Sequence, residues 1–267
     1  MPAVRLAKLK SEIDRLLESF GSPAEFKRSL DNLLEFYSDR VYRAGQNVPF
    51  RPLTPTRHVP PLVIQQIELA LRPYCSYYPL PAMALADSLW PDPYLETRRM
   101  AAFILGQAVV DPAQPVLQRL QNWAKPDVPT EIIELLFTLG TASLRKENPG
   151  LWLETLQSWL LGPDLERQRL GLKALLPLVE DPSFDNLPPI FRMITVFLHN
   201  PQQTLLASLQ SLLEALIRRS PTEAHFFLRQ ILGSPTPPLT IRLIRHIIPL
   251  FSAEAQASLR KMVLVRS

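Results

Sequence analysis

The feature that most constrains the fold of this chain is an internal repeat with a period of 35 to 38 residues. Each copy begins with a turn that contains proline and continues as an apolar helix about four turns long. Corresponding positions in the five copies are Glu96, Glu131, Glu166, Thr204 and Thr240. A first helix is expected before each of these second helices, at 80–90, 113–124, 149–161, 187–198 and 221–232, and a final helix at 253–264 closes the series. One helix pair cannot bury its apolar face alone, so stacked pairs share a continuous core.

The use of proline and glycine supports an all-α fold. The chain has 28 prolines and 8 glycines, and proline is excluded from central strands and from helix interiors. It is favoured at the first position of a helix, where its missing N–H costs nothing. No stretch alternates with period two for long enough to form a sheet. Glu96, Glu131 and Glu166 fall in first turns, where the helix dipole stabilises an anion by about 0.3–1 kcal/mol.

The part of the chain before the repeats is predicted to form an N-terminal cap. Residues 3–19 and 23–37 have the pattern of a helical hairpin, and a further helix is expected at 62–72. The intervening segment 37–62 is irregular and rich in proline, so it is either functional, mobile or packed. We favour packing, because Tyr37, Tyr42 and Phe50 give this segment side chains to bury. The expected organisation is a cap at 1–79 and repeats at 80–267, within one continuous domain.

Composition and motifs exclude several classes of function. With 46% hydrophobic and 20% charged residues the chain is typical of a soluble globular protein. It contains no GxGxxG or GxxxxGK[ST] motif, so no nucleotide cofactor is predicted, and no GxSxG elbow of a hydrolase.

The histidines are too far apart for a metal site; they are His58, His199, His225 and His246. No run approaches ~20 apolar residues, which argues against a membrane span. Cys75 is the only cysteine, which favours a reducing compartment, the cytoplasm.

The stretch "ALADSLWPDPYLETRRMAAFILGQ" (84–107) resembles a HEAT-type repeat and, more narrowly, the DNA alkylation repair family of AlkD-like glycosylases. The matching pattern is a helix that ends in tryptophan, a short turn and an E-x-R-x-x-A-x-x-x-L-G helix. The repeat resemblance covers about 80–264 and the narrower one about 80–180. It implies a right-handed α-solenoid of HEAT-like pairs. It also implies a family activity, the excision of positively charged alkylated bases from DNA held along a concave basic surface.

The same resemblance implies a catalytic arrangement, which this chain fills only in part. The family has a tryptophan and an aspartate one turn apart on the next second helix, and an arginine one repeat later. Here "PTEIIELLFTLG" (129–140) places Glu134 at the aspartate position and Thr130 at the aromatic one. The later helix offers Gln168 and Arg169, with Glu166 where an aromatic residue would help. Because a misplacement of ~1 Å can cost about 100-fold in rate, the longer acid without its aromatic neighbour predicts loss of excision. The alternative is a glycosylase that uses Glu134.

Basic residues recur on the second helices and form a candidate nucleic-acid interface. They are Arg98, Arg99, Arg167, Arg169, Lys173, Arg218, Arg219, Arg242, Arg245 and His246. Residues 201–267 carry a net charge of +5, whereas the first 200 residues carry −1, which gives +4 for the whole chain. One basic stripe along the groove would suit contacts with DNA phosphates, which position a duplex without reading its sequence. The alternative is that these side chains pair with first-turn acids or face solvent.

Tryptophan provides a second candidate for contact with bases. Trp90, Trp123 and Trp159 lie near the ends of first helices and are predicted to pack between repeats. Trp152 is left as the candidate for stacking on a base.

Taken together, the leading hypothesis is a non-catalytic α-solenoid that binds a macromolecule along its concave face, DNA in its most concrete form. The alternatives are the glycosylase and a protein–protein scaffold.

Overall fold

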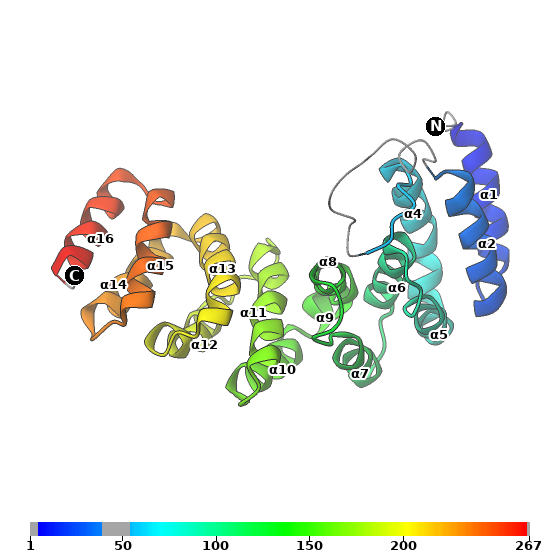
Figure 1. Cartoon of the computed structure of the whole chain (residues 1–267). Helices are drawn as coiled ribbons and strands as arrows, with labels where there is room; N and C mark the ends of the chain where they lie inside the picture. Colours follow the sequence, from blue (N-terminus) through cyan, green and yellow to red (C-terminus); the bar gives the residue numbers. More distant parts are fainter. Residues whose placement is uncertain (1–4, 39–53, 266–267) are drawn as a thin grey trace. The chain divides into compact units, whose positions relative to one another are not determined.

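The computed structural model describes residues 5–38 and 54–265, and the chain divides into two compact units (Figure 1). The N-terminal unit is Met1–Asn148 and the C-terminal unit is Pro149–Ser267. Throughout the described ranges, all regular secondary structure is helical, which confirms the all-α prediction. The right-handed HEAT-like solenoid, the cap at 1–79 and the single continuous domain stay predictions.

In chain order, the N-terminal unit contains α1 (Leu6–Glu18), α2 (Pro23–Phe36), α4 (Pro61–Tyr77), α5 (Pro79–Leu89), α6 (Leu95–Gln107), α7 (Gln114–Trp123), α8 (Thr130–Leu135), the π-helical turn η1 (Leu136–Gly140) and α9 (Ala142–Glu147). Helix α6 is the centre of this unit, because α4, α5, α8 and η1 all pack against it. Its buried positions run almost without interruption from Met100 to Gly106.

The C-terminal unit contains α10 (Pro149–Leu161), α11 (Leu165–Glu180), α12 (Pro188–His199), the 3-10 turn η2 (Gln203–Leu205), α13 (Leu206–Arg219), α14 (Pro221–Gly233), α15 (Pro238–Ile247), the 3-10 turn η3 (Ile248–Leu250) and α16 (Ala253–Val265). Second helices pack in sequence, α11 on α13 and α13 on α15, and first helices do the same, α12 on α14. The unit is therefore built from two helical layers, a first-helix layer and a second-helix layer.

Most of the predicted first helices are found within a residue or two of their expected bounds. The reason is local, because proline occupies the first or second position of α2, α4, α5, α7, α12, α14 and α15. In the first turns of α6, α8 and α11 the acids are Glu96, Glu131 and Glu166, as the repeat predicts.

Helix α4 is longer than the predicted 62–72, because it continues through Pro73 to Tyr77. A proline inside a helix removes one backbone hydrogen bond and disfavours continuation. Here Val63, Ile67, Leu71 and Cys75 form one fully buried stripe on the helix, and this burial outweighs the cost of the proline.

The second helix predicted at 129–140 is not a uniform α-helix. It changes to a π-helical turn at Leu136, and an unpredicted helix, α9, follows. Gly106 of α6 lies against this turn so closely that a Cβ there would collide with the carbonyl oxygen of Leu139. The side chain of Arg145 donates to the carbonyl oxygens of Phe137 and Thr138, at 2.9 and 3.1 Å. Close backbone approach and side-chain capping therefore stabilise a turn that the apolar pattern did not indicate.

The described part of segment 37–62 is well packed. Tyr37 is 1% exposed, and its ring meets that of Phe36 edge-on at 4.9 Å. Thr54, Arg57 and Val59 are also buried. Tyr42 and Phe50, the other two residues expected to bury this segment, lie outside the described residues.

Candidate nucleic-acid interface

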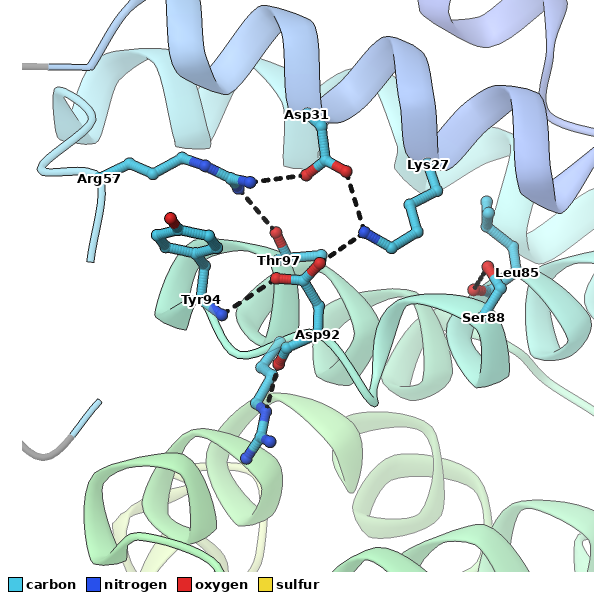
Figure 2. Close-up of polar contacts among 9 residues, drawn as sticks. Lys27, Asp31, Arg57, Leu85, Ser88, Asp92, Tyr94 and Thr97 are labelled. Atoms are coloured by element: carbon cyan, nitrogen blue, oxygen red, sulfur yellow. Dashed lines mark hydrogen bonds and ion pairs between the residues drawn. The ribbon is translucent and has the colours of Figure 1, made fainter. Parts of the chain in front are cut away.

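A partly buried polar network joins segment 54–60 to α2 and α6 in the N-terminal unit (Figure 2). The guanidinium of Arg57 donates to Asp31 Oδ1 at 2.8 Å and to Thr97 Oγ1 at 3.0 Å. Its Cζ lies 4.0 Å from the centre of the Tyr94 ring, within the range of a cation–π interaction. Arg57 was not predicted from the sequence, where its only signal is a charged residue between the prolines of "TPTRHVPP" (54–61).

Lys27 extends this network from the other side of Asp31, as Figure 2 shows. Its Nζ donates to Asp31 Oδ2 at 2.9 Å and to Asp92 Oδ2 at 2.5 Å. Burial disfavours the charged ammonium, yet the hydrogen bonds and the attraction from Asp92 and Asp31 outweigh it and raise the pKa of Lys27. The network is held by charge pairs within the fold, so it is a structural joint between the hairpin and α6.

Glu96 belongs to the same joint. Its side chain is buried, and Oε1 accepts from Thr56 Oγ1 at 2.8 Å, from the Arg57 N–H at 2.8 Å and from the Val59 N–H at 3.4 Å. Among the described residues, Oε2 has no hydrogen-bond partner. The first-turn acid of the repeat thus does more than face the helix dipole, because it fastens segment 54–60 to the start of α6.

The two candidate arginines of α6 have partners within their own unit. Arg98 donates from Nε to the carbonyl oxygen of Asp92 at 2.7 Å, and its guanidinium lies 5.7 Å from the Trp90 ring. Arg99 donates from Nε to Glu68 Oε1 of α4 at 2.7 Å. Both side chains are half-buried. Each therefore has a structural role, whether or not it also contacts a ligand.

Glu134, the candidate catalytic acid, is exposed in the last turn of α8, directly before η1. Thr130 occupies the position one turn earlier and is exposed as well. The helix face that carries the acid thus presents a hydroxyl where the family resemblance implies an aromatic ring.

On α11 the predicted basic residues lie against their own unit. The Arg167 guanidinium is 5.2 Å from the Trp159 ring. Arg169 pairs with the first-turn acid Glu166, with 2.5 Å between Nη2 and Oε2. Lys173, one turn further along, is half-buried. This part of the stripe follows the alternative reading, in which basic residues pair with first-turn acids.

The two arginines at the end of α13 differ from each other. The Arg218 side chain is 61% exposed. Its Nη2 lies 3.9 Å from Glu180 Oε1, and because both side chains are exposed this ion pair is weak. Arg219 donates to the Pro182 and Phe184 carbonyl oxygens and to Asp185, so it holds the turn after α11. Arg218 is available to an external partner, and Arg219 is a structural residue.

Three of the predicted basic residues lie close together on α15. Arg242, Arg245 and His246 are exposed and, together with Leu206 and Gln210 of α13, line a depression of about 420 Å³. The residues that line it include no acid. An anion entering here meets two guanidinium groups and no repelling carboxylate.

The tryptophans are packing residues in both units. Trp90 and Trp123 stack at 4.5 Å with an interplanar angle of 5°. Trp159 is buried as predicted. The expectation for Trp152 was wrong: its side chain is 0% exposed and meets Trp159 edge-on at 5.8 Å, so it cannot stack on a base. Its position at the fourth residue of α10 directs it into the core.

In the described part of the chain, no three His, Cys, Asp or Glu side chains are grouped to hold a metal ion. None of the helices described is long and apolar enough to cross a membrane. Burial raises the pKa of the Cys75 thiol to about 12, so this cysteine is unsuited to act as a nucleophile.

No curated protein and no solved structure matches this chain significantly. A family model described as "DNA alkylation repair enzyme" matches residues 62–243. The matched region begins in α4 and ends within α15, so it includes the predicted basic residues as far as Arg242, while Arg245 and His246 lie beyond its end. Since the match covers more than half of the chain, the protein belongs to the DNA alkylation repair enzyme family.

Proposed function

We propose that this protein binds duplex DNA through its phosphates and does not excise bases. The observation that carries the proposal is the depression on α15, where Arg242, Arg245 and His246 gather without an acid. Phosphate contacts of this kind supply affinity without sequence specificity. Family membership supports DNA as the polyanion.

In the proposed arrangement the two units continue one right-handed superhelix of HEAT-like pairs, with the N-terminal hairpin as its cap. The second helices would then face a common groove, and Lys173 and Arg218, whose side chain is 61% exposed, would add to the contacts made by α15. Arg98, Arg99, Arg167 and Arg169 would add contacts from side chains that also hold the fold together.

Fluorescence anisotropy with a labelled duplex at low salt tests DNA binding. Each lost phosphate contact reduces the slope of log affinity against log salt by about 0.9. The double variant Arg242→Gln with Arg245→Gln should therefore bind on the order of tenfold more weakly, with a slope smaller by about 2. The matched control is Arg229→Gln, an exposed arginine on α14, which should leave both quantities unchanged.

Two results would count against the proposal in different ways. An unchanged salt slope in the double variant would remove α15 from the interface. Absence of wild-type binding at low salt would remove DNA as the partner.

The alternative function is a glycosylase that uses Glu134, and the family match favours it. Its test is base release from alkylated duplex DNA by the wild type and by Glu134→Gln. Release by the wild type that is lost in the variant would establish the enzyme and overturn the non-catalytic proposal. Equal release by both would exclude Glu134 from the mechanism.

A further inference from the structure

The outward surface of the first-helix layer in the C-terminal unit contains two neighbouring grooves. One lies between α10 and α12, with a volume of about 280 Å³, and the other between α12 and α14, with about 710 Å³. Arg192 of α12 lines both grooves, so it stands on the ridge that separates them. These grooves belong to a different helical layer from the depression on α15, and the inference does not depend on DNA binding.

Large apolar side chains border these grooves and are exposed. Leu161 at the end of α10 is 70% exposed, Val196 of α12 is 46% exposed and Phe226 of α14 is 62% exposed. Phe191 and Phe227 form the floor of the wider groove, with their rings 4.9 Å apart. Single exposed apolar residues are common, but a contiguous set along grooves marks an interaction surface.

The charge on this surface indicates the chemistry of the partner. Arg192 is exposed where the two grooves meet. It is surrounded by apolar side chains, and arginine next to exposed aromatic residues is the composition of an interface hot spot. Glu223 of α14 also lines the wider groove. A polyanion such as nucleic acid would be repelled by Glu223 and would leave the apolar side chains uncovered.

We propose that the outward face of α10, α12 and α14 binds an amphipathic α-helix of a partner protein. Apolar residues on one face of that helix, spaced i, i+3 or i+4 and i+7, would cover Leu161, Val196 and Phe226. An aspartate or glutamate on the same face would pair with Arg192. A helix fits better than an added strand, because the described part of this unit is helical and offers no sheet edge.

The test uses the full chain and a labelled, alanine-based helical peptide of about 18 residues. Leucines form its apolar stripe, and one position beside the stripe is glutamate, glutamine or lysine. For the wild type, anisotropy should give the tightest binding for the glutamate peptide and the weakest for the lysine peptide. Arg192→Glu should reverse this order, with about a tenfold loss for the glutamate peptide. Phe226→Ala should weaken all three peptides by roughly tenfold or more.

A reversed order of peptide affinities in Arg192→Glu also shows that the variant is folded, because a misfolded variant would bind all three peptides equally weakly. Arg229→Glu supplies the matched charge change on α14 and should keep the wild-type order. Four results would overturn the proposal. They are the absence of saturable binding, the same peptide order in Arg192→Glu, displacement of the peptide by duplex DNA, and a wild-type dimer that Phe226→Ala dissociates. The last result would assign this face to a second copy of the chain.

Discussion

The arginines of α6 and those of α15 lie on corresponding helices of two different copies of the sequence repeat, but their surroundings differ. Arg98 and Arg99 are half-buried, and they donate to the Asp92 carbonyl oxygen and to Glu68. Arg242 and Arg245 are exposed and line a depression with no acid. On α6 the arginines hold a turn and a neighbouring helix, whereas on α15 the guanidinium groups are exposed at the surface.

This difference shows that position within a repeat does not decide what a charged side chain does. Arg98 and Arg99 are structural because they are half-buried beside a carbonyl oxygen and an acid. Along the sequence the same contrast is visible only as a sum, because residues 201–267 carry a net +5 and the first 200 residues carry −1. We therefore expect substitutions in the N-terminal unit to change stability and those on α15 to change binding.

The largest effect is expected for Gly106→Ala. Alanine normally stabilises a helix interior by about 1 kcal/mol over glycine. At Gly106 the new methyl group would collide with the backbone of η1, and we expect a net loss of roughly 3 kcal/mol or more. Chemical denaturation measures it. Gly150→Ala at the start of α10, with nothing within 4 Å of its Cβ position, should change stability by less than about 1 kcal/mol. Equal changes at the two glycines would contradict the close packing of α6 on η1.

The next effect sharpens the contrast between structural and exposed arginines. Arg57→Ala removes the partner of Asp31 and Thr97 from a buried site, and should cost about 3 kcal/mol of unfolding free energy. Arg242→Ala removes an exposed side chain and should cost less than about 0.5 kcal/mol. Denaturant titration of both variants compares them directly. A similar loss in both would mean that α15 is as structural as the 54–60 segment.

The smallest effect is expected on DNA affinity. Arg99→Gln keeps a side chain able to donate to Glu68 and should change the dissociation constant by less than about twofold, whereas Arg242→Gln should weaken binding by several-fold. Anisotropy at a single low salt concentration measures both. Should Arg99→Gln prove the more damaging, the comparison between α6 and α15 would be reversed.

The sequence predicts helix positions well because their signals are local. Proline starts, first-turn acids and apolar spacing all act within one helix, and the observed bounds follow them. The π-helical turn and α9 could not be predicted, because they depend on the contact between Gly106 and the Leu139 carbonyl, which are 33 positions apart. For the same reason α4 was predicted too short: Pro73 is visible in the sequence, while the burial that compensates for it is not.

The candidate site was predicted in part. The second-helix basic residues could be named from the repeat, and the structure brings Arg242, Arg245 and His246 together. Their contact with DNA stays a prediction. The partners of Arg98, Arg99 and Arg57 could not be predicted, since they come from three different parts of the chain. They are Asp92 in the turn before α6, Glu68 of α4 and Asp31 of α2. Trp152 was misassigned because helix-end spacing does not report which way a mid-helix ring points.

The four tryptophans have a practical consequence for experiments on the two units. One pair, Trp90 and Trp123, lies in the N-terminal unit, and the other, Trp152 and Trp159, lies in the C-terminal unit. Replacing either pair by phenylalanine leaves tryptophan in one half only, which tryptophan-selective excitation would observe. Chains built from more than one compact unit often lose two-state behaviour. Emission spectra recorded during heating would then reveal whether the halves melt together or in succession.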